Sequence, residues 1–69
     1  MRISARNVLR GKVLEVKKGQ TTAHVRLELS SGDVLTAAIT NEAVDELGLK
    51  AGEQAYAVIK ASDVMIGKD

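Results

Sequence analysis

The chain has 69 residues, of which 45% are hydrophobic and 28% charged, and its formal net charge at pH 7 is +1. This length allows one domain, expected over residues 1–69, and the near-neutral charge gives no general attraction to nucleic acid or to a membrane surface. The absence of cysteine excludes disulfides and thiolate metal sites, and a single histidine does not predict a metal cation bound directly by protein ligands.

The hydrophobic residues predict a small core. There is no Phe or Trp and only one Tyr, so Val, Leu, Ile and Ala must fill the interior, and each buries less area than an aromatic side chain. A single core of this size usually supplies only about 3–5 kcal/mol, so we expect the chain to form a homo-oligomer. No apolar run suggests a membrane span and no signal-peptide pattern opens the chain, which predicts a cytoplasmic protein.

The first half of the chain predicts three strands. Residues 9–17 form a Val- and Leu-rich segment, and residues 23–29 alternate apolar with polar side chains, which is typical of a half-buried strand. The sequence "SSGD" favours a turn, and residues 34–40 are again apolar and β-branched, so these last two segments form a hairpin.

The second half predicts a short helix and two further strands. Thr40 or Asn41 can cap the N-terminus of a two-turn helix that ends at Gly48. Residues 55–61 predict a fourth strand and residues 63–67 a short fifth one. Five short strands with a helix after the third indicate an all-β fold, a five-stranded Greek-key barrel of the OB type.

Catalytic motifs are absent, so the sequence predicts that the protein is not an enzyme. It has no nucleophile elbow, no phosphate-binding loop and no dinucleotide-binding glycine pattern. The adjacent carboxylates of Asp45 and Glu46 point apart on a short helix and are interpreted as part of a solvated face. His24 on a polar strand face is interpreted as a surface or interface residue rather than a metal ligand.

Two short stretches at opposite ends of the chain are rich in hydrogen-bond donors and contain no carboxylate. They are Ser4-Ala5-Arg6-Asn7 and Lys60-Ala61-Ser62. Arg and Lys only donate, Ser can donate, and free backbone N–H groups add further donors. Such a set suits a small tetrahedral dianion, if the first and last strands are neighbours. The residues alone leave a plainer interpretation open, in which Arg6 and Lys60 pair with acids such as Asp63.

Nearly the whole chain resembles the molbindins, small bacterial molybdate-binding proteins built from a single TOBE domain. The resemblance rests on "ISARNVLRGKVLEVKKG", "TTAHVRLEL" and "GDVLTAAITNEAVDELGLKAGEQAYAVIKASDVMI". It implies an OB-like barrel that assembles into a hexamer, a trimer of dimers. It also implies that molybdate and tungstate bind at subunit interfaces, without an organic cofactor, for intracellular molybdenum storage or homeostasis.

The resemblance also implies the residues of the oxyanion site. Ser4, Arg6, Lys60 and Ser62 would contact the anion, helped by backbone amides near Ala5 and Ala61. Asn7 belongs to the same stretch.

Thr40 would reach the anion from a neighbouring subunit. Molbindins have a second type of oxyanion site near a symmetry axis, for which Thr22 and His24 are the candidates here.

Two alternatives to oxyanion binding follow from the residues. One is an OB-type module that binds single-stranded nucleic acid, although the chain offers one Tyr for stacking and no basic excess. The other is a structural assembly domain whose interface pockets stay empty.

Overall fold

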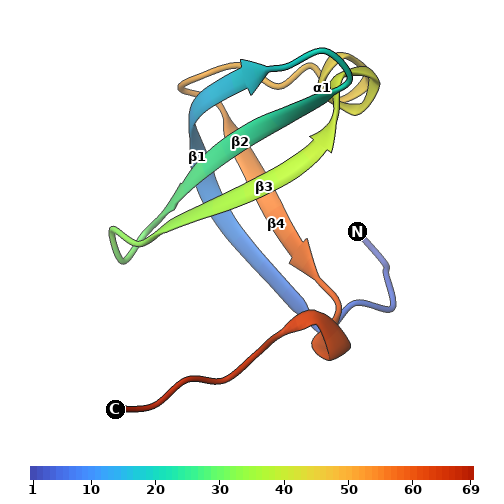
Figure 1. Ribbon diagram of the computed structural model, residues 1–69. Coiled ribbons are helices and arrows are strands. Elements are labelled where there is room, and N and C mark those ends of the chain that lie inside the picture. The colour runs from blue at the N-terminus through green and yellow to red at the C-terminus, as the bar shows by residue number, and fades with distance from the viewer.

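The computed structural model describes all 69 residues and contains four β-strands, one α-helix and one short 3₁₀ helix. In chain order the elements are β1 (Asn7–Lys18), β2 (Thr22–Leu29), β3 (Val34–Thr40), α1 (Asn41–Leu47), β4 (Gln54–Ile59) and η1 (Ala61–Asp63). The strands form one antiparallel sheet in the order β3-β2-β1-β4, with β4 beside β1 (Figure 1). This is the Greek-key order that the sequence predicts.

Strand alternation positions the core. Exposed and buried residues alternate along β2, because one face of the strand lies on the concave side of the curled sheet and the other faces solvent. One residue of β1, three of β2 and one of α1 are fully buried: Val13, Ala23, Val25, Leu27 and Val44. With only five buried residues, the isolated chain has the small core expected from its composition.

A β-bulge curves β1. Val13 pairs with Leu27 and Glu15 pairs with Arg26, so Leu14 is an extra residue without a partner in β2. A bulge of this kind bends its strand and increases the local twist. The bend helps the long β1 to pair with β2 along one stretch and with β4 along another.

Gly11 lies where β1 passes close to β2. A Cβ atom built on it would lie 2.7 Å from the Glu28 carbonyl oxygen and 2.7 Å from Leu27 Cγ. Real Cβ atoms do not approach backbone this closely, so glycine is required here for close approach.

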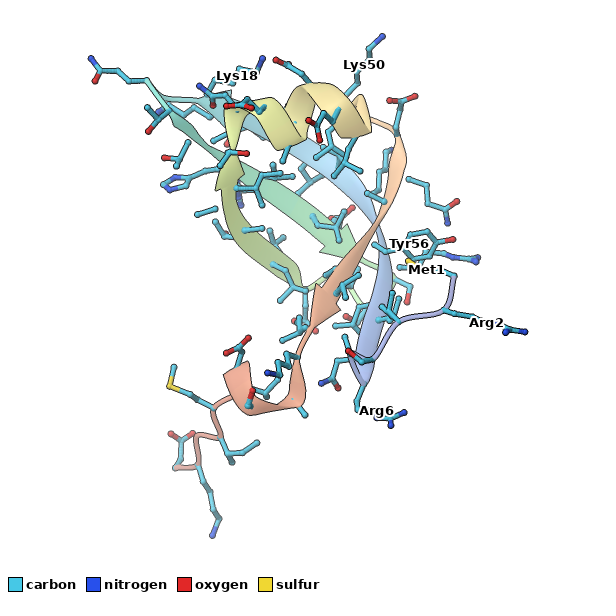
Figure 2. The ribbon with its side chains drawn as sticks, turned by 90° about the vertical axis from the view of Figure 1, so that its right-hand side faces the viewer. Met1, Arg2, Arg6, Lys18, Lys50 and Tyr56 are labelled. Atoms are coloured by element: carbon cyan, nitrogen blue, oxygen red, sulfur yellow. The ribbon has the colours of Figure 1, made fainter.

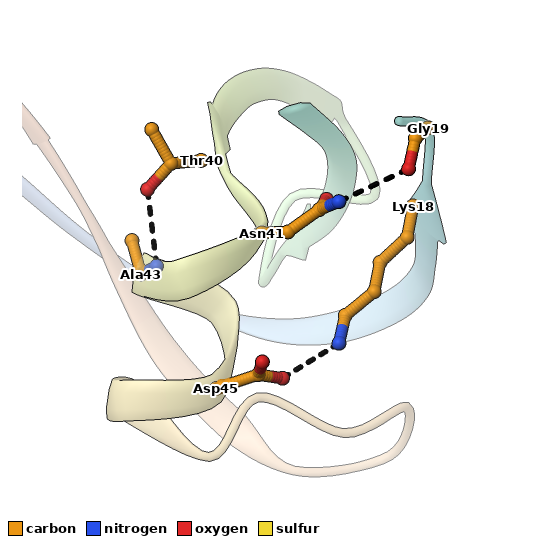
Figure 3. Close-up of polar contacts among 6 residues, drawn as sticks. All are labelled: Lys18, Gly19, Thr40, Asn41, Ala43 and Asp45. Carbon is orange, nitrogen blue, oxygen red and sulfur yellow. Dashed lines mark hydrogen bonds and ion pairs between the residues drawn. The ribbon is translucent and has the colours of Figure 1, made fainter. Parts of the chain in front are cut away.

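The helix α1 has the capping residues predicted for it. Of the two candidates, Thr40 is the N-cap, and its Oγ1 accepts a hydrogen bond of 3.0 Å from the Ala43 N–H (Figure 3). Gly48 ends the helix in the left-handed region, at φ 63°. No helix of the protein combines the length and apolar character needed to cross a membrane.

Three polar contacts hold α1 against the β1–β2 turn. Lys18 Nζ lies 2.6 Å from Asp45 Oδ1, and Asn41 Nδ2 donates to the Gly19 carbonyl oxygen at 3.0 Å (Figure 3). The Asn41 N–H also donates to the Thr21 carbonyl oxygen at 2.9 Å. These contacts fix α1 at one end of the curled sheet.

The predicted fifth strand and the closed barrel are wrong for the single chain. The segment 63–67 forms no strand, and Met65 and Ile66 are 92% and 90% exposed. A strand exists only where a neighbour completes its backbone hydrogen bonds, and residues 64–69 run away from the sheet (Figure 1). The predicted fourth strand also ends earlier, at Ile59, because the chain turns into η1. The result is a curled half-barrel whose edge strands, β3 and β4, do not pair with each other.

Candidate oxyanion-binding site

The two donor-rich stretches lie side by side in one chain. Asn7 at the start of β1 pairs with Ile59 at the end of β4, and Asn7 Nδ2 donates to the Ile59 carbonyl oxygen at 3.2 Å. Residues 4–6, which precede β1, and residues 60–62, which follow β4, therefore lie at the same end of the sheet. Figure 2 shows Arg6 at this end of the sheet, the end that carries η1.

The cations at this end have no acidic partner. The one ion pair within 4.0 Å in the protein joins Lys18 to Asp45, at the opposite end of the sheet. Arg6 and Lys60 thus pair neither with Asp63 nor with any other carboxylate. The plainer interpretation, a cluster neutralised by nearby acids, is not the arrangement found.

The short helix η1 adds backbone donors. The Asp63 N–H donates to the Lys60 carbonyl oxygen at 2.9 Å, and the Val64 N–H donates to the Ala61 carbonyl oxygen at 3.3 Å. The N–H groups of Ala61 and Ser62 make no such bond, and no Lys60 side-chain cap covers them. The resemblance to the molbindins implies a role for amides near Ala61, but no signal in the sequence indicates the 3₁₀ turn that leaves these N–H groups free.

One chain supplies only part of an enclosure. Ser4, Arg6, Lys60 and Ser62 are all exposed, and Ala5 and Asn7 are half-buried. A dianion bound here would touch donors on one side and solvent on the other. The protein contains no group of three or more His, Cys, Asp or Glu side chains that could hold a metal ion.

Thr40 lies at the other end of the sheet. It pairs with Thr22 of β2. The next residue of β2, Ala23, pairs with Lys18 at the end of β1. Asn7 lies at the start of the same 12-residue β1, which in extended form spans roughly 35 Å. Thr40 of one chain therefore cannot reach that chain's own donor stretches.

The two residues predicted for a second site share the Thr40 end. Thr22 pairs with Thr40, and His24 pairs with Ala38 on β3 and with Lys17 on β1. Both Thr22 and His24 are exposed. The structure thus groups them away from the first site.

An apolar groove, not predicted from the sequence, lies between the two edge strands. Its volume is about 550 Å³, and 13 of its 15 lining residues are hydrophobic. β3 contributes Leu35 and Ile39, and β4 contributes the whole run from Gln54 to Ile59. The signal was present in the sequence, because an uninterrupted apolar run such as residues 55–59 is typical of a strand covered on both faces.

The comparison with protein families agrees with this architecture. The model of the TOBE domain matches residues 3–66, which include both donor stretches and every strand. The chain belongs to the TOBE-domain family.

Several relatives of this TOBE domain are named molybdenum-pterin-binding proteins. The chain is 53% identical over 66 residues to molybdenum-pterin-binding protein 3 of Clostridium pasteurianum, covering 96% of this chain and 97% of that protein.

Solved structures show the same fold. A molybdate-binding protein of Sporomusa ovata aligns with a TM-score of 0.93 at 37% identity, covering 99% of this chain and 100% of that one. The cytoplasmic molybdate-binding protein ModG, with molybdate bound, aligns with a TM-score of 0.90 at 51% identity, covering 94% of this chain and 46% of that one.

Proposed function

We propose that this protein is a single TOBE domain over residues 1–69 that binds molybdate, and tungstate by the same chemistry, without catalysing a reaction. The observation that carries the proposal is that two donor stretches without a carboxylate meet in the fold, at the Asn7–Ile59 pair. Two structures with this fold, at 37% and 51% identity, are of proteins named molybdate-binding, and a relative of 53% identity is named a molybdenum-pterin-binding protein. We further propose a cytoplasmic role in molybdenum storage or homeostasis, in keeping with the cytoplasmic ModG.

Each donor has a distinct role in this proposal. Arg6 and Lys60 supply two positive charges for a dianion, and Ser4 and Ser62 supply hydroxyl donors. The N–H groups near Ala5 and Ala61 complete the set on this side. Asn7 already uses its amide to bond Ile59, so its role is to join the two stretches as well as to offer its second N–H.

The second side of the site comes from another chain. We propose a homo-oligomer, a hexamer built as a trimer of dimers, in which Thr40 of a neighbour faces the donor stretches. The distance along β1 supports this arrangement, because Thr40 cannot reach them within one chain. Thr22 and His24, near the same Thr40, would form the second type of site at a symmetry axis.

The fifth strand of the barrel also belongs to this proposal. The exposed segment 64–66 is apolar and has no partner, whereas the groove between β3 and β4 is apolar and uncovered. We propose that the segment from one chain fills the groove of another and completes the five-stranded barrel there. Such an exchange would add the buried area that the small core of one chain lacks.

The residues of this chain suit binding of an oxyanion better than binding of an aromatic ring such as a pterin or a nucleic-acid base. A pterin ring or a nucleic-acid base needs an aromatic surface for stacking. Tyr56 is the one aromatic residue, and the Arg10 guanidinium carbon already lies 5.7 Å from the centre of its ring. No comparison supports nucleic-acid binding, and short single-stranded oligonucleotides should give no salt-sensitive change in fluorescence anisotropy.

Titration calorimetry with molybdate, tungstate and sulfate tests the proposal. We expect Arg6→Ala to weaken molybdate binding by about 2–3 kcal/mol, because a charge-assisted hydrogen bond to the anion is lost. Arg10→Ala is the matched control, since Arg10 lies on β1, four residues after Arg6, with its guanidinium over Tyr56, and the affinity of this variant should be unchanged. Sulfate is smaller and should bind more weakly than molybdate.

Two results would count against the proposal. Absence of heat with both molybdate and tungstate would contradict oxyanion binding. Equal losses in the Arg6 and Arg10 variants would remove Arg6 from the site.

Metal analysis separates binding from a purely structural assembly domain. Protein purified from molybdate-fed cells should carry molybdenum, whereas a structural domain with empty pockets should not.

A further inference from the structure

The donor end of the sheet has one carboxylate beside it. Residues 1–14 and 54–62 contain no Asp or Glu, and Asp63 is the first acid after Ser62. The other acids lie elsewhere along the chain, as Glu15, Glu28, Asp33, Glu42, Asp45, Glu46, Glu53 and Asp69. Asp63 is therefore the acid that the sequence brings directly to the proposed site.

The turn of η1 holds Asp63 close to Lys60. The Asp63 N–H donates to the Lys60 carbonyl oxygen at 2.9 Å, so the two residues stand one turn apart. One turn of a 3₁₀ helix rises roughly 6 Å. The Asp63 side chain is exposed, makes no ion pair within 4.0 Å and accepts no hydrogen bond from another side chain. Its negative charge is therefore not cancelled by direct contact.

We propose that Asp63 is a built-in competitor of the bound oxyanion, which tunes the affinity of the site downwards. In the empty site its carboxylate stands one helical turn from Lys60, without an ion pair between them. In the occupied site the same carboxylate repels the dianion bound one turn away. The inference rests on the proposed function of the donor stretches. Those residues strengthen anion binding, whereas Asp63 weakens it.

The physical reason is the sign and range of the charges. A dianion and a carboxylate roughly 6–8 Å apart repel each other, and salt screens this only in part because the Debye length is about 10 Å at 0.1 M. A site with two unpaired cations and several free donors would otherwise hold its ligand tightly. A protein that stores an anion must also release it, and a fixed negative charge beside the site favours release.

Calorimetric titration of the full chain with molybdate tests the inference. Asp63→Asn keeps the shape of the side chain and should bind molybdate roughly three- to tenfold more tightly than the unaltered protein at 0.1 M sodium chloride. Asp63→Glu restores the charge and should return the affinity to within about twofold of the unaltered protein. Glu53→Gln removes an exposed carboxylate at the far end of β4, roughly 20 Å away, and should change nothing.

Salt dependence separates electrostatic repulsion from a change in structure. At 1 M salt the Debye length falls to about 3 Å, so the gain in Asp63→Asn should shrink to less than about twofold. A gain that persists unchanged at 1 M salt would contradict the electrostatic account. An Asp63→Asn affinity equal to that of the unaltered protein, with Arg6→Ala still defective, would overturn the role of Asp63 and leave the proposed function standing. Failure of the unaltered protein to bind molybdate would overturn both.

Discussion

At the scale of single residues, short-range geometry decides what each position tolerates. Gly11 shows this most clearly, because its Cβ position is blocked by the Glu28 carbonyl oxygen as well as by Leu27. A side chain could move aside, but backbone in the centre of a sheet cannot. The sequence places Gly11 inside the predicted first strand, residues 9–17, but does not reveal the obstacle, because that comes from the next strand along the chain.

Substitution of Gly11 by alanine should therefore destabilise the fold. We expect Gly11→Ala to lower the free energy of unfolding by about 1–3 kcal/mol, as in other overpacked sites. Urea denaturation followed by circular dichroism would measure the change. Gly67→Ala is the matched control, because nothing lies within 4 Å of its Cβ position, and it should leave the midpoint unchanged.

At the scale of elements, local patterns predicted the structure wherever the partner of an element lies in the same chain. The alternation from Ala23 to Leu29 predicted β2, and the "SSGD" turn joined it to β3, because both signals are local. The predicted fifth strand failed because its pattern carries no information about which edge will pair with it. The candidate site has the same limit. A barrel fold allows the first and last strands to be neighbours, but the spacing of the two donor stretches along the chain does not require Asn7 to pair with Ile59.

The helix α1 offers a test at this scale. Thr40→Ala removes the cap on the Ala43 N–H and should lower stability by about 1 kcal/mol, whereas Thr40→Ser should keep most of it. Thermal unfolding would measure the stability of both variants. Thr36→Ala, at an exposed position on the same strand, is the control. Equal stability of Thr40→Ala and the unaltered protein would show that the cap contributes nothing.

At the scale of the whole molecule, the single chain leaves much of its apolar surface uncovered. It has five buried residues, an apolar groove between edge strands that do not pair with each other, and an exposed apolar segment at residues 64–66. The proposed oligomer would cover the groove and the segment. The composition predicted the small core, because the chain has no Phe or Trp. The composition could not predict where the uncovered surface lies, since that depends on which strands end at the edges.

Assembly should therefore depend on the apolar segment that follows η1. We expect Ile66→Asp to shift the protein from an oligomer towards monomer in light scattering, because a charge cannot enter the apolar groove without a large desolvation cost. Lys68→Asp alters charge in the same segment outside its apolar part and should leave the mass unchanged. A monomer in the unaltered protein at micromolar concentration would contradict the proposed oligomer.

The most direct measurement is a crystal structure of the protein soaked in molybdate, with the molybdenum located by its anomalous scattering. We expect a peak between residues 4–7 and 60–62 of one chain, within hydrogen-bond distance of Arg6 and Lys60, with Thr40 of a neighbouring chain completing the site. A fully occupied peak elsewhere, with the donor stretches bound only to solvent or to acids, would contradict the proposed site.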